Sequence, residues 1–306
     1  EGIAQRNPRR HHTRLIGFYL FILPQCFLIK NLHKVIVSPS LLSYNLRMHL
    51  LFAAILGIVE GVTEFLPISS TAHLILTTKL LGLPQNEYWT FFEVFIQAGA
   101  ILAVITSYIP LLTQKHMLKN VFISFIPTAV IGFLLRKTIK TYFFGNMMIM
   151  GSAFVLVAVL FLLLEVLVKK GAISLSKNTK EMTWKEALLI GIIQACAIVP
   201  GVSRAGAVLV ACMVLGYKRS ESALYSFALA VPTIGAAALL DLVKTDKALI
   251  ISSLPTSIIG FVAAFVSALL VVKILVKYLQ GHDLIPFAWY RIIVGVFILS
   301  SVFLFK

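Results

Sequence analysis

The sequence predicts an all-α protein that crosses a membrane several times. Hydrophobic residues make up 59% of the 306 residues, and only 13% are charged. Apolar runs near or above about 18 residues recur along the chain, and runs of that length predict membrane-spanning helices. Carboxylates, hydroxyls and an imidazole interrupt this background at residues 60–73. Because an ionised carboxylate at the centre of a membrane helix costs about 2.5 kcal/mol or more, this run marks a candidate site.

The net charge of +15 is also compatible with a membrane protein. In membrane proteins, Lys and Arg gather in cytoplasmic loops and contact anionic lipids. No nucleic-acid-binding motif accompanies the basic residues, so we expect membrane lipids as partners and no nucleic acid. The most basic loop is 168–185, which we expect on the cytoplasmic side.

The first 47 residues are interpreted as an N-terminal extension. Met48 is the first methionine, and the apolar stretch 15–29 is short and contains Pro24. A signal-like region and an extra anchor are both compatible with this stretch. We expect instead that the native protein begins at Met48, which leaves a single integral-membrane domain over 48–306.

Ten apolar segments follow one another from Met48 onward. We expect helices at 49–66, 69–81, 88–108, 118–135, 144–168, 184–199, 203–216, 222–243, 249–279 and 286–305. Breaks between them are expected at Pro67, Pro84, Pro110, Pro200 and Pro286. The segments 69–81 and 203–216 are too short to cross about 30 Å of hydrocarbon, so each is a candidate re-entrant helix.

An internal repeat relates the two halves of this domain. PTAVIGF at 127–133 returns as PTSIIGF at 255–261, and GIVE at 57–60 corresponds to GIIQ at 191–194. Paired halves with interrupted helices in matching places are typical of inverted-repeat membrane proteins, whose sites form where the broken helices meet. The halves run in opposite directions if each has an odd number of spans, which the sequence leaves open. We place the halves at about 48–168 and 183–306.

Glu60 and Glu64 are four residues apart, so on a helix they share one face. Two carboxylates this close and away from water cannot both stay ionised without help. A divalent cation, Mg²⁺ or Ca²⁺, would supply that help and accepts carboxylate oxygens. Two solvated carboxyls at a helix end are the alternative.

Hydroxyls and a histidine follow the break at Pro67. Ser70 and His73 lie one helical turn apart, a spacing that suits a nucleophile and its base. Ser69 or Ser70 capping the helix, with His73 merely packed, is the alternative, and capping is compatible with catalysis.

The second half supplies groups that suit an anion. Gly201 allows close backbone approach, Ser203 adds a hydroxyl, and Arg204 adds a planar fork suited to phosphate oxygens. Glu93 and Gln97 are a further polar pair that would add ligands or hydrogen bonds. Arg219 is a weaker candidate for an anion contact. Carboxylates with a metal on one side and arginine with N–H groups on the other describe a phosphate or diphosphate site.

At these residues the chain resembles the undecaprenyl-diphosphate phosphatase family of the bacitracin-resistance type. Three blocks in order carry the resemblance: EGVTEFLPISSTAH at 60–73, TFFEVFIQAG at 90–99 and PGVSR at 200–204. The resemblance implies six spanning helices plus two re-entrant helix pairs in an inverted repeat. It also implies a multi-pass enzyme of the bacterial inner membrane that hydrolyses the C55 polyprenyl diphosphate. Its product would be the carrier for peptidoglycan synthesis, its activity would confer bacitracin resistance, and its site would face the periplasm.

The family's functional residues match this sequence position by position. Its acid pair matches Glu60 and Glu64, its serine and histidine match Ser70 and His73, and its phosphate-binding pair matches Ser203 and Arg204.

The chain departs from the family pattern at a few positions. The family usually has Ser-Arg-Ser-Gly-x-Thr, but here Ala205 and Val208 replace the second serine and the threonine. These replacements remove two hydroxyls from the loop. Ala72 stands where glycine is common, which a helix tolerates.

The resulting hypothesis is a cation-assisted lipid diphosphatase. Glu60 and Glu64 would hold the metal, and Arg204 with loop N–H groups would hold the terminal phosphoryl group. Ser70, helped by His73, would attack it, and Ser69, Gly201, Ser203 and Gln97 would contact the substrate. A metal-activated water with Glu64 or His73 as base is the competing mechanism.

Two other classes of protein share some of these features. Acid-phosphatase-like lipid phosphatases need a Lys-x₆-Arg-Pro motif, and no Arg-Pro occurs in this chain. An inverted-repeat lipid or ion transporter also fits intramembrane carboxylates, although a carrier needs no nucleophile with its base. The sequence does not indicate an oligomeric state.

Overall fold

The computed structural model describes residues 39–84, 86–138, 142–143 and 145–304. The chain divides into two compact units, residues 1–51 and 52–306. The described part of the first unit is residues 39–51, which form the beginning of helix α2 (Pro39–Thr63). Residues 1–38 lie outside the described residues, so the interpretation of the extension stays a prediction.

Helices form nearly all of the described second unit, which confirms the all-α prediction. After α2, the first half contains α3 (Ser70–Leu80), α4 (Glu87–Leu112), α5 (Lys115–Thr138) and α6 (Met147–Lys169). The second half contains α7 (Trp184–Ala195), α8 (Arg204–Val214), α9 (Arg219–Lys244), α10 (Lys247–Gly281) and α11 (Ile285–Leu304). Two single-turn 3₁₀ helices, η2 (Thr179–Glu181) and η3 (Cys196–Ile198), flank α7.

Six of the described helices, α4 to α6 and α9 to α11, are long and apolar enough to cross a membrane. The chain is therefore a multi-pass membrane protein. Three of these helices fall in each half, an odd number that supports the inverted repeat. Helices α3 and α8 have 11 residues each, or about 16 Å at 1.5 Å per residue, which is too short to span the hydrocarbon. That they are re-entrant stays a prediction.

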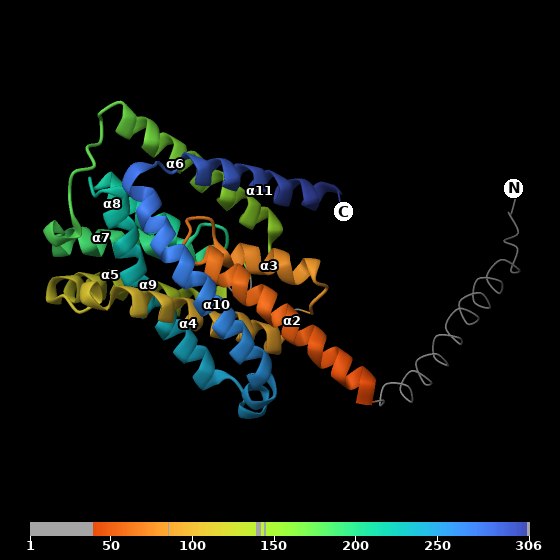
Figure 1. Cartoon of the computed structure of the whole chain (residues 1–306). Helices are drawn as coiled ribbons and strands as arrows, with labels where there is room; N and C mark the ends of the chain where they lie inside the picture. The colour runs from red at the N-terminus through yellow and green to blue at the C-terminus, as the bar shows by residue number, and fades with distance from the viewer. Residues whose placement is uncertain (1–38, 85, 139–141, 144, 305–306) are drawn as a thin grey trace, which may run out of the picture. The chain divides into compact units, whose positions relative to one another are not determined.

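Helices of the two halves pack against each other. In Figure 1, α6 lies alongside α11, while α4 packs against α10 and α9. Phe65, Phe161 and Phe227 are fully or almost fully buried in the largest hydrophobic cluster, which draws on both halves.

Glycines bring the helices that precede these loops close to their neighbours. A Cβ atom on Gly57 of α2 would lie 2.3 Å from the carbonyl oxygen of Gly260, and one on Gly191 of α7 would lie 2.2 Å from that of Ser124. Side chains at these two positions would displace the backbones of α10 and α5. Because Gly57 and Gly191 are equivalent in the repeat, both halves use the same close packing.

The helix break predicted at Pro110 is wrong, because the structure has a kinked helix there instead. Pro110 lies inside α4, and the helix is kinked at Tyr108, whose φ is −129° and ψ is 27°. Proline removes one helical hydrogen bond and crowds the preceding turn, so a kink two residues earlier accommodates it. The prolines at 67 and 200 do lie in breaks between helices, as predicted.

Candidate active site

Two serines with unusual backbone geometry begin the short helices. Ser69 precedes α3 with a φ of 71°, and Ser203 precedes α8 with a φ of 76°. Among the described residues they are the only non-glycine residues with positive φ. The left-handed region is uncommon for serine and recurs where surrounding structure constrains a functional loop. The two positions are 134 residues apart, which is the offset between GIVE at 57–60 and GIIQ at 191–194 in the repeat.

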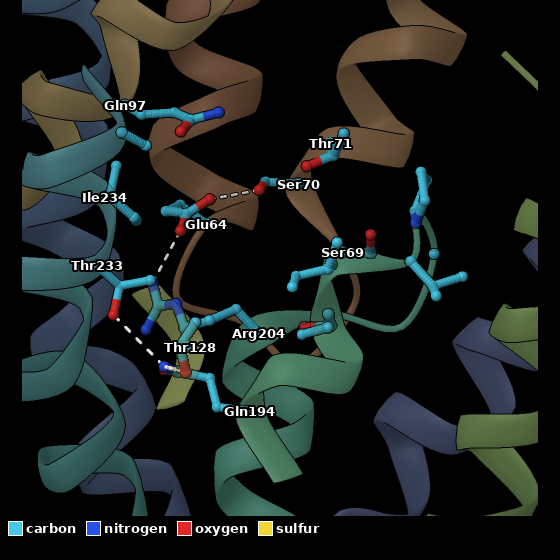
Figure 2. Close-up of a pocket in the computed structure, with 17 residues that line it drawn as sticks. Glu64, Ser69, Ser70, Thr71, Gln97, Thr128, Gln194, Arg204, Thr233 and Ile234 are labelled. Carbon is cyan, nitrogen blue, oxygen red and sulfur yellow. Dashed lines mark hydrogen bonds and ion pairs between the residues drawn. The ribbon is translucent and has the colours of Figure 1, made fainter. Parts of the chain in front are cut away.

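A cavity of about 220 Å³ lies between these two loops. Seven of the nine predicted site residues line it, and they come from both halves (Figure 2). The seven are Glu64, Ser69, Ser70, Gln97, Gly201, Ser203 and Arg204. The cavity is smaller than the roughly 300–1,000 Å³ of pockets that enclose drug-sized ligands, so it suits a polar headgroup.

Glu64 connects the two loops through its carboxylate (Figure 2). The hydroxyl of Ser70 donates a hydrogen bond to Glu64 Oε2, and Arg204 Nη2 donates to Glu64 Oε1 at 2.8 Å. Arg204 Nη1 donates to the carbonyl of Ser226 on α9 at 2.8 Å. The nucleophile candidate and the arginine are thus bound to the same buried carboxylate.

His73 lies outside the pocket lining. Its Nδ1 is 2.8 Å from the carbonyl oxygen of Ser69, and its Nε2 is 2.6 Å from the hydroxyl of Tyr290 on α11. A carbonyl only accepts, so Nδ1 carries the hydrogen, and Nε2 of the neutral ring accepts from Tyr290. Both ring nitrogens are therefore engaged away from Ser70, whose hydroxyl is bonded to Glu64.

Buried polar atoms without partners occur in the cavity lining and on Glu60, which lies one helical turn before Glu64 and outside the lining. The described residues contain six such side-chain atoms, and four of them belong to Glu60, Gln194 and Arg204. They are both carboxylate oxygens of Glu60, Oε1 of Gln194 and Nε of Arg204. Buried polar groups in folded proteins almost always have a partner, so this concentration indicates a site that receives a polar ligand.

The residues present fit a divalent cation bound together with a phosphate. Glu60 is fully buried one helical turn before Glu64, and its two unpartnered oxygens need a cation or a proton. The described residues contain no group of three or more His, Cys, Asp or Glu that could hold a metal. One or two carboxylates plus substrate phosphates are nevertheless a usual set of ligands for Mg²⁺.

Some polar residues of the pocket were missing from the predicted site. Gln194 Nε2 donates to Thr128 Oγ1 at 2.7 Å and to Thr233 Oγ1 at 3.4 Å, and all three residues line the cavity. Each threonine directly follows a proline inside an apolar helix, a signal that could have found them. Arg219 does not line the cavity and instead pairs with the buried carboxylate of Glu165.

The three departures from the family pattern, at Ala72, Ala205 and Val208, fall outside the cavity lining. Ala205 and Val208 are buried in α8 with exposed fractions of 1% and 0%, and neither lines the pocket. The lining hydroxyl of this loop belongs to Ser203 instead.

Comparison with known proteins shows the family of the chain. Residues 53–297 match the family described as "Bacitracin resistance protein BacA". The chain belongs to this family. An "Undecaprenyl-diphosphatase" of Sulfurihydrogenibium sp. (strain YO3AOP1) is 44% identical over 81% of this chain and 98% of that protein. Proteins of the same name from Aquifex aeolicus (strain VF5) and Wolinella succinogenes are 39% and 41% identical, over 83% and 82% of this chain and 98% of each protein.

Proposed function

We propose that this protein hydrolyses undecaprenyl diphosphate to undecaprenyl phosphate and inorganic phosphate. The observation that carries the proposal is the buried Ser70–Glu64–Arg204 chain, which lines a small cavity of a multi-pass membrane protein. Family membership and the names of the relatives support the substrate. The product would re-enter peptidoglycan synthesis as the lipid carrier, and the activity would confer bacitracin resistance.

The second loop would hold the terminal phosphoryl group. Arg204 already uses Nη1 and Nη2 for protein contacts, but its buried Nε has no partner. An N–H donor in this position can bind a phosphate oxygen, and hydrogen bonds between arginine and phosphate are charge-assisted. The backbone around Gly201 and Ser203 would contact the remaining oxygens.

Ser70 would attack the terminal phosphorus. Its hydroxyl donates to Glu64, so this carboxylate is placed to accept the proton as the Ser70 oxygen–phosphorus bond forms. The bridging phosphorus–oxygen bond breaks, and undecaprenyl phosphate leaves. Water then cleaves the serine–phosphate bond. Direct attack by water is the competing route, and Ser70→Ala with retained activity would assign the attack to water.

Glu60 and Glu64 would hold the divalent cation, Mg²⁺ or Ca²⁺. The two unpartnered Glu60 oxygens support this assignment. When bound there, the cation would neutralise part of the negative charge of the diphosphate.

We also propose that the protein lies in the bacterial inner membrane and that its pocket opens to the periplasm. Six helices able to cross a membrane and membership of the family support the membrane assignment. The periplasmic orientation rests on the family resemblance, because the spent lipid carrier is released on that face.

Phosphate release from C55 diphosphate by the purified protein tests the proposal. The wild type should release phosphate when Mg²⁺ or Ca²⁺ is present, and Glu64→Ala and Arg204→Ala should lose this activity while remaining folded. Glu87→Ala, at an exposed position at the start of α4, is the control and should match the wild type. A transporter would release no phosphate, and that result would reject the enzyme assignment. Variants at 64 and 204 that keep the wild-type rate would reject the site.

A further inference from the structure

Arg291 of α11 binds the loop before α3 and the loop before α8, and it does so from outside the cavity. Its side chain is fully buried and does not line the cavity. Arg291 Nη1 donates to the carbonyl of Pro67 at 3.0 Å, and Nη2 donates to the carbonyl of Gly201 at 2.6 Å. Longer bonds of 3.4 Å to the carbonyls of Ala153 and Phe154 attach the guanidinium to α6. One side chain therefore joins the two loops to a third element.

The two bonded carbonyls are equivalent in the repeat. Pro67 and Gly201 are 134 residues apart, and each lies two residues before a serine with positive φ. The bonds to Arg291 thus restrain the same point of each loop, next to the unfavourable conformations of Ser69 and Ser203. Residues held in such conformations persist only where the surrounding structure restrains them.

Burying the charge of an arginine costs desolvation free energy that an apolar side chain in the same place would not cost. Among the described ion pairs, none includes Arg291, so no carboxylate compensates its charge there. The backbone carbonyls and the ring of Phe154, whose centroid is 4.7 Å from the guanidinium carbon, provide that compensation. Only the planar guanidinium offers several donors in fixed directions, so it can hold two carbonyls at a defined separation.

We propose that Arg291 is a positioning residue that sets the spacing between the Ser70 loop and the Arg204 loop. The proposal rests on the proposed diphosphatase function, in which one loop holds the phosphoryl group and the other attacks it. A displacement of about 1 Å between such groups is enough to slow a reaction about 100-fold. Arg291 itself does not touch the substrate.

Kinetics of Arg291→Lys and Arg291→Gln test this role. Lysine keeps the charge and glutamine keeps two donors, but neither can bind both carbonyls in one fixed plane. We expect kcat to fall by about tenfold or more while KM changes by less than about threefold, because the cavity lining is intact. Arg219→Lys is the matched control, since Arg219 is a partly buried arginine that does not line the pocket. It should lower thermal stability and leave kcat within about twofold of the wild type.

Amide hydrogen exchange without substrate gives the second readout. In both Arg291 variants, residues 66–71 and 199–204 should exchange faster together, by about tenfold, and Arg219→Lys should leave both loops unchanged. Faster exchange in one loop alone, unchanged exchange in both, or an unchanged kcat would overturn the proposal. If the wild type releases no phosphate, the proposed function fails, while the exchange of the two loops still decides whether Arg291 restrains them.

Discussion

At the scale of single residues, the two oxygens of Glu64 have different partners. Oε2 accepts from the Ser70 hydroxyl, and Oε1 accepts from Arg204. The oxygen that accepts from Ser70 is therefore placed to receive the proton of this hydroxyl, while the other oxygen stays bound to the guanidinium. Because Arg204 Nε has no partner, a phosphate can bind this arginine without breaking its bond to Glu64.

Most of these residues could be predicted because their chemistry is local in sequence. The spacing of Glu60, Glu64 and Ser70 around a proline is visible in one short run. The partner of the Ser70 hydroxyl was not predictable, since helical spacing gives a shared face but not the direction of a side chain. A preceding proline inside an apolar helix marks Thr128 and Thr233, but only the fold brings them to the pocket, because neither lies in the three blocks that predicted the site.

Replacement of His73 distinguishes a base from a structural contact. In the structure, His73 Nδ1 donates a hydrogen bond to the carbonyl of Ser69. The side-chain amide of Asn can donate a similar bond, so His73→Asn should keep kcat within about tenfold of the wild type. His73→Ala should lose clearly more activity. Equal and severe losses in both variants, measured by phosphate release, would instead indicate that His73 transfers protons.

Glu60→Gln tests the proposed cation site. Removing one of two carboxylates should raise the cation concentration for half-maximal activity by about 10-fold or more and weaken cation binding in calorimetry. The exposed Glu87→Gln serves as the control. Identical cation dependence in Glu60→Gln and the wild type would remove Glu60 from the site.

At the scale of elements, the paired loops and short helices follow from prolines and segment lengths. The segments predicted at 69–81 and 203–216 are helices Ser70–Leu80 and Arg204–Val214. Residues 64–66 were predicted as helical but form the turn before Pro67. The kink near Pro110 was mistaken for a helix end, because a proline alone does not distinguish the two outcomes.

The close packing of α7 against α5 is tested at Gly191. A Cβ atom there would lie 2.2 Å from the carbonyl oxygen of Ser124, so Gly191→Ala must move one backbone. We expect a loss of about 1–3 kcal/mol of stability, measured as a lower thermal unfolding temperature in detergent. Gly235→Ala in α9 is the control, since a Cβ atom meets nothing within 4 Å there. A Gly191→Ala protein as stable as the control would contradict the close contact.

At the scale of the whole molecule, the repeat is symmetric in backbone and asymmetric in chemistry. The offset of 134 places Ser70 opposite Arg204 and Glu60 opposite Gln194. At these positions the first half has the Ser70 hydroxyl and the Glu60 carboxylate, and the second half has the Arg204 guanidinium and the Gln194 amide. Neither half contains a complete site, so the proposed reaction depends on how the two loops meet. The sequence predicts the two halves, but the contact between residues 140 positions apart required the structure.

The most direct test of this account is a double-mutant cycle of Glu64→Gln and Arg204→Lys on kcat/KM for phosphate release. Each single variant should lose about 100-fold or more, because each removes a group proposed to act on the same phosphoryl group. The double variant should be hardly worse than the poorer single variant, because residues that act as a unit are not additive. If the two losses multiply, the loops act independently, and the claim that both halves form one active site is contradicted.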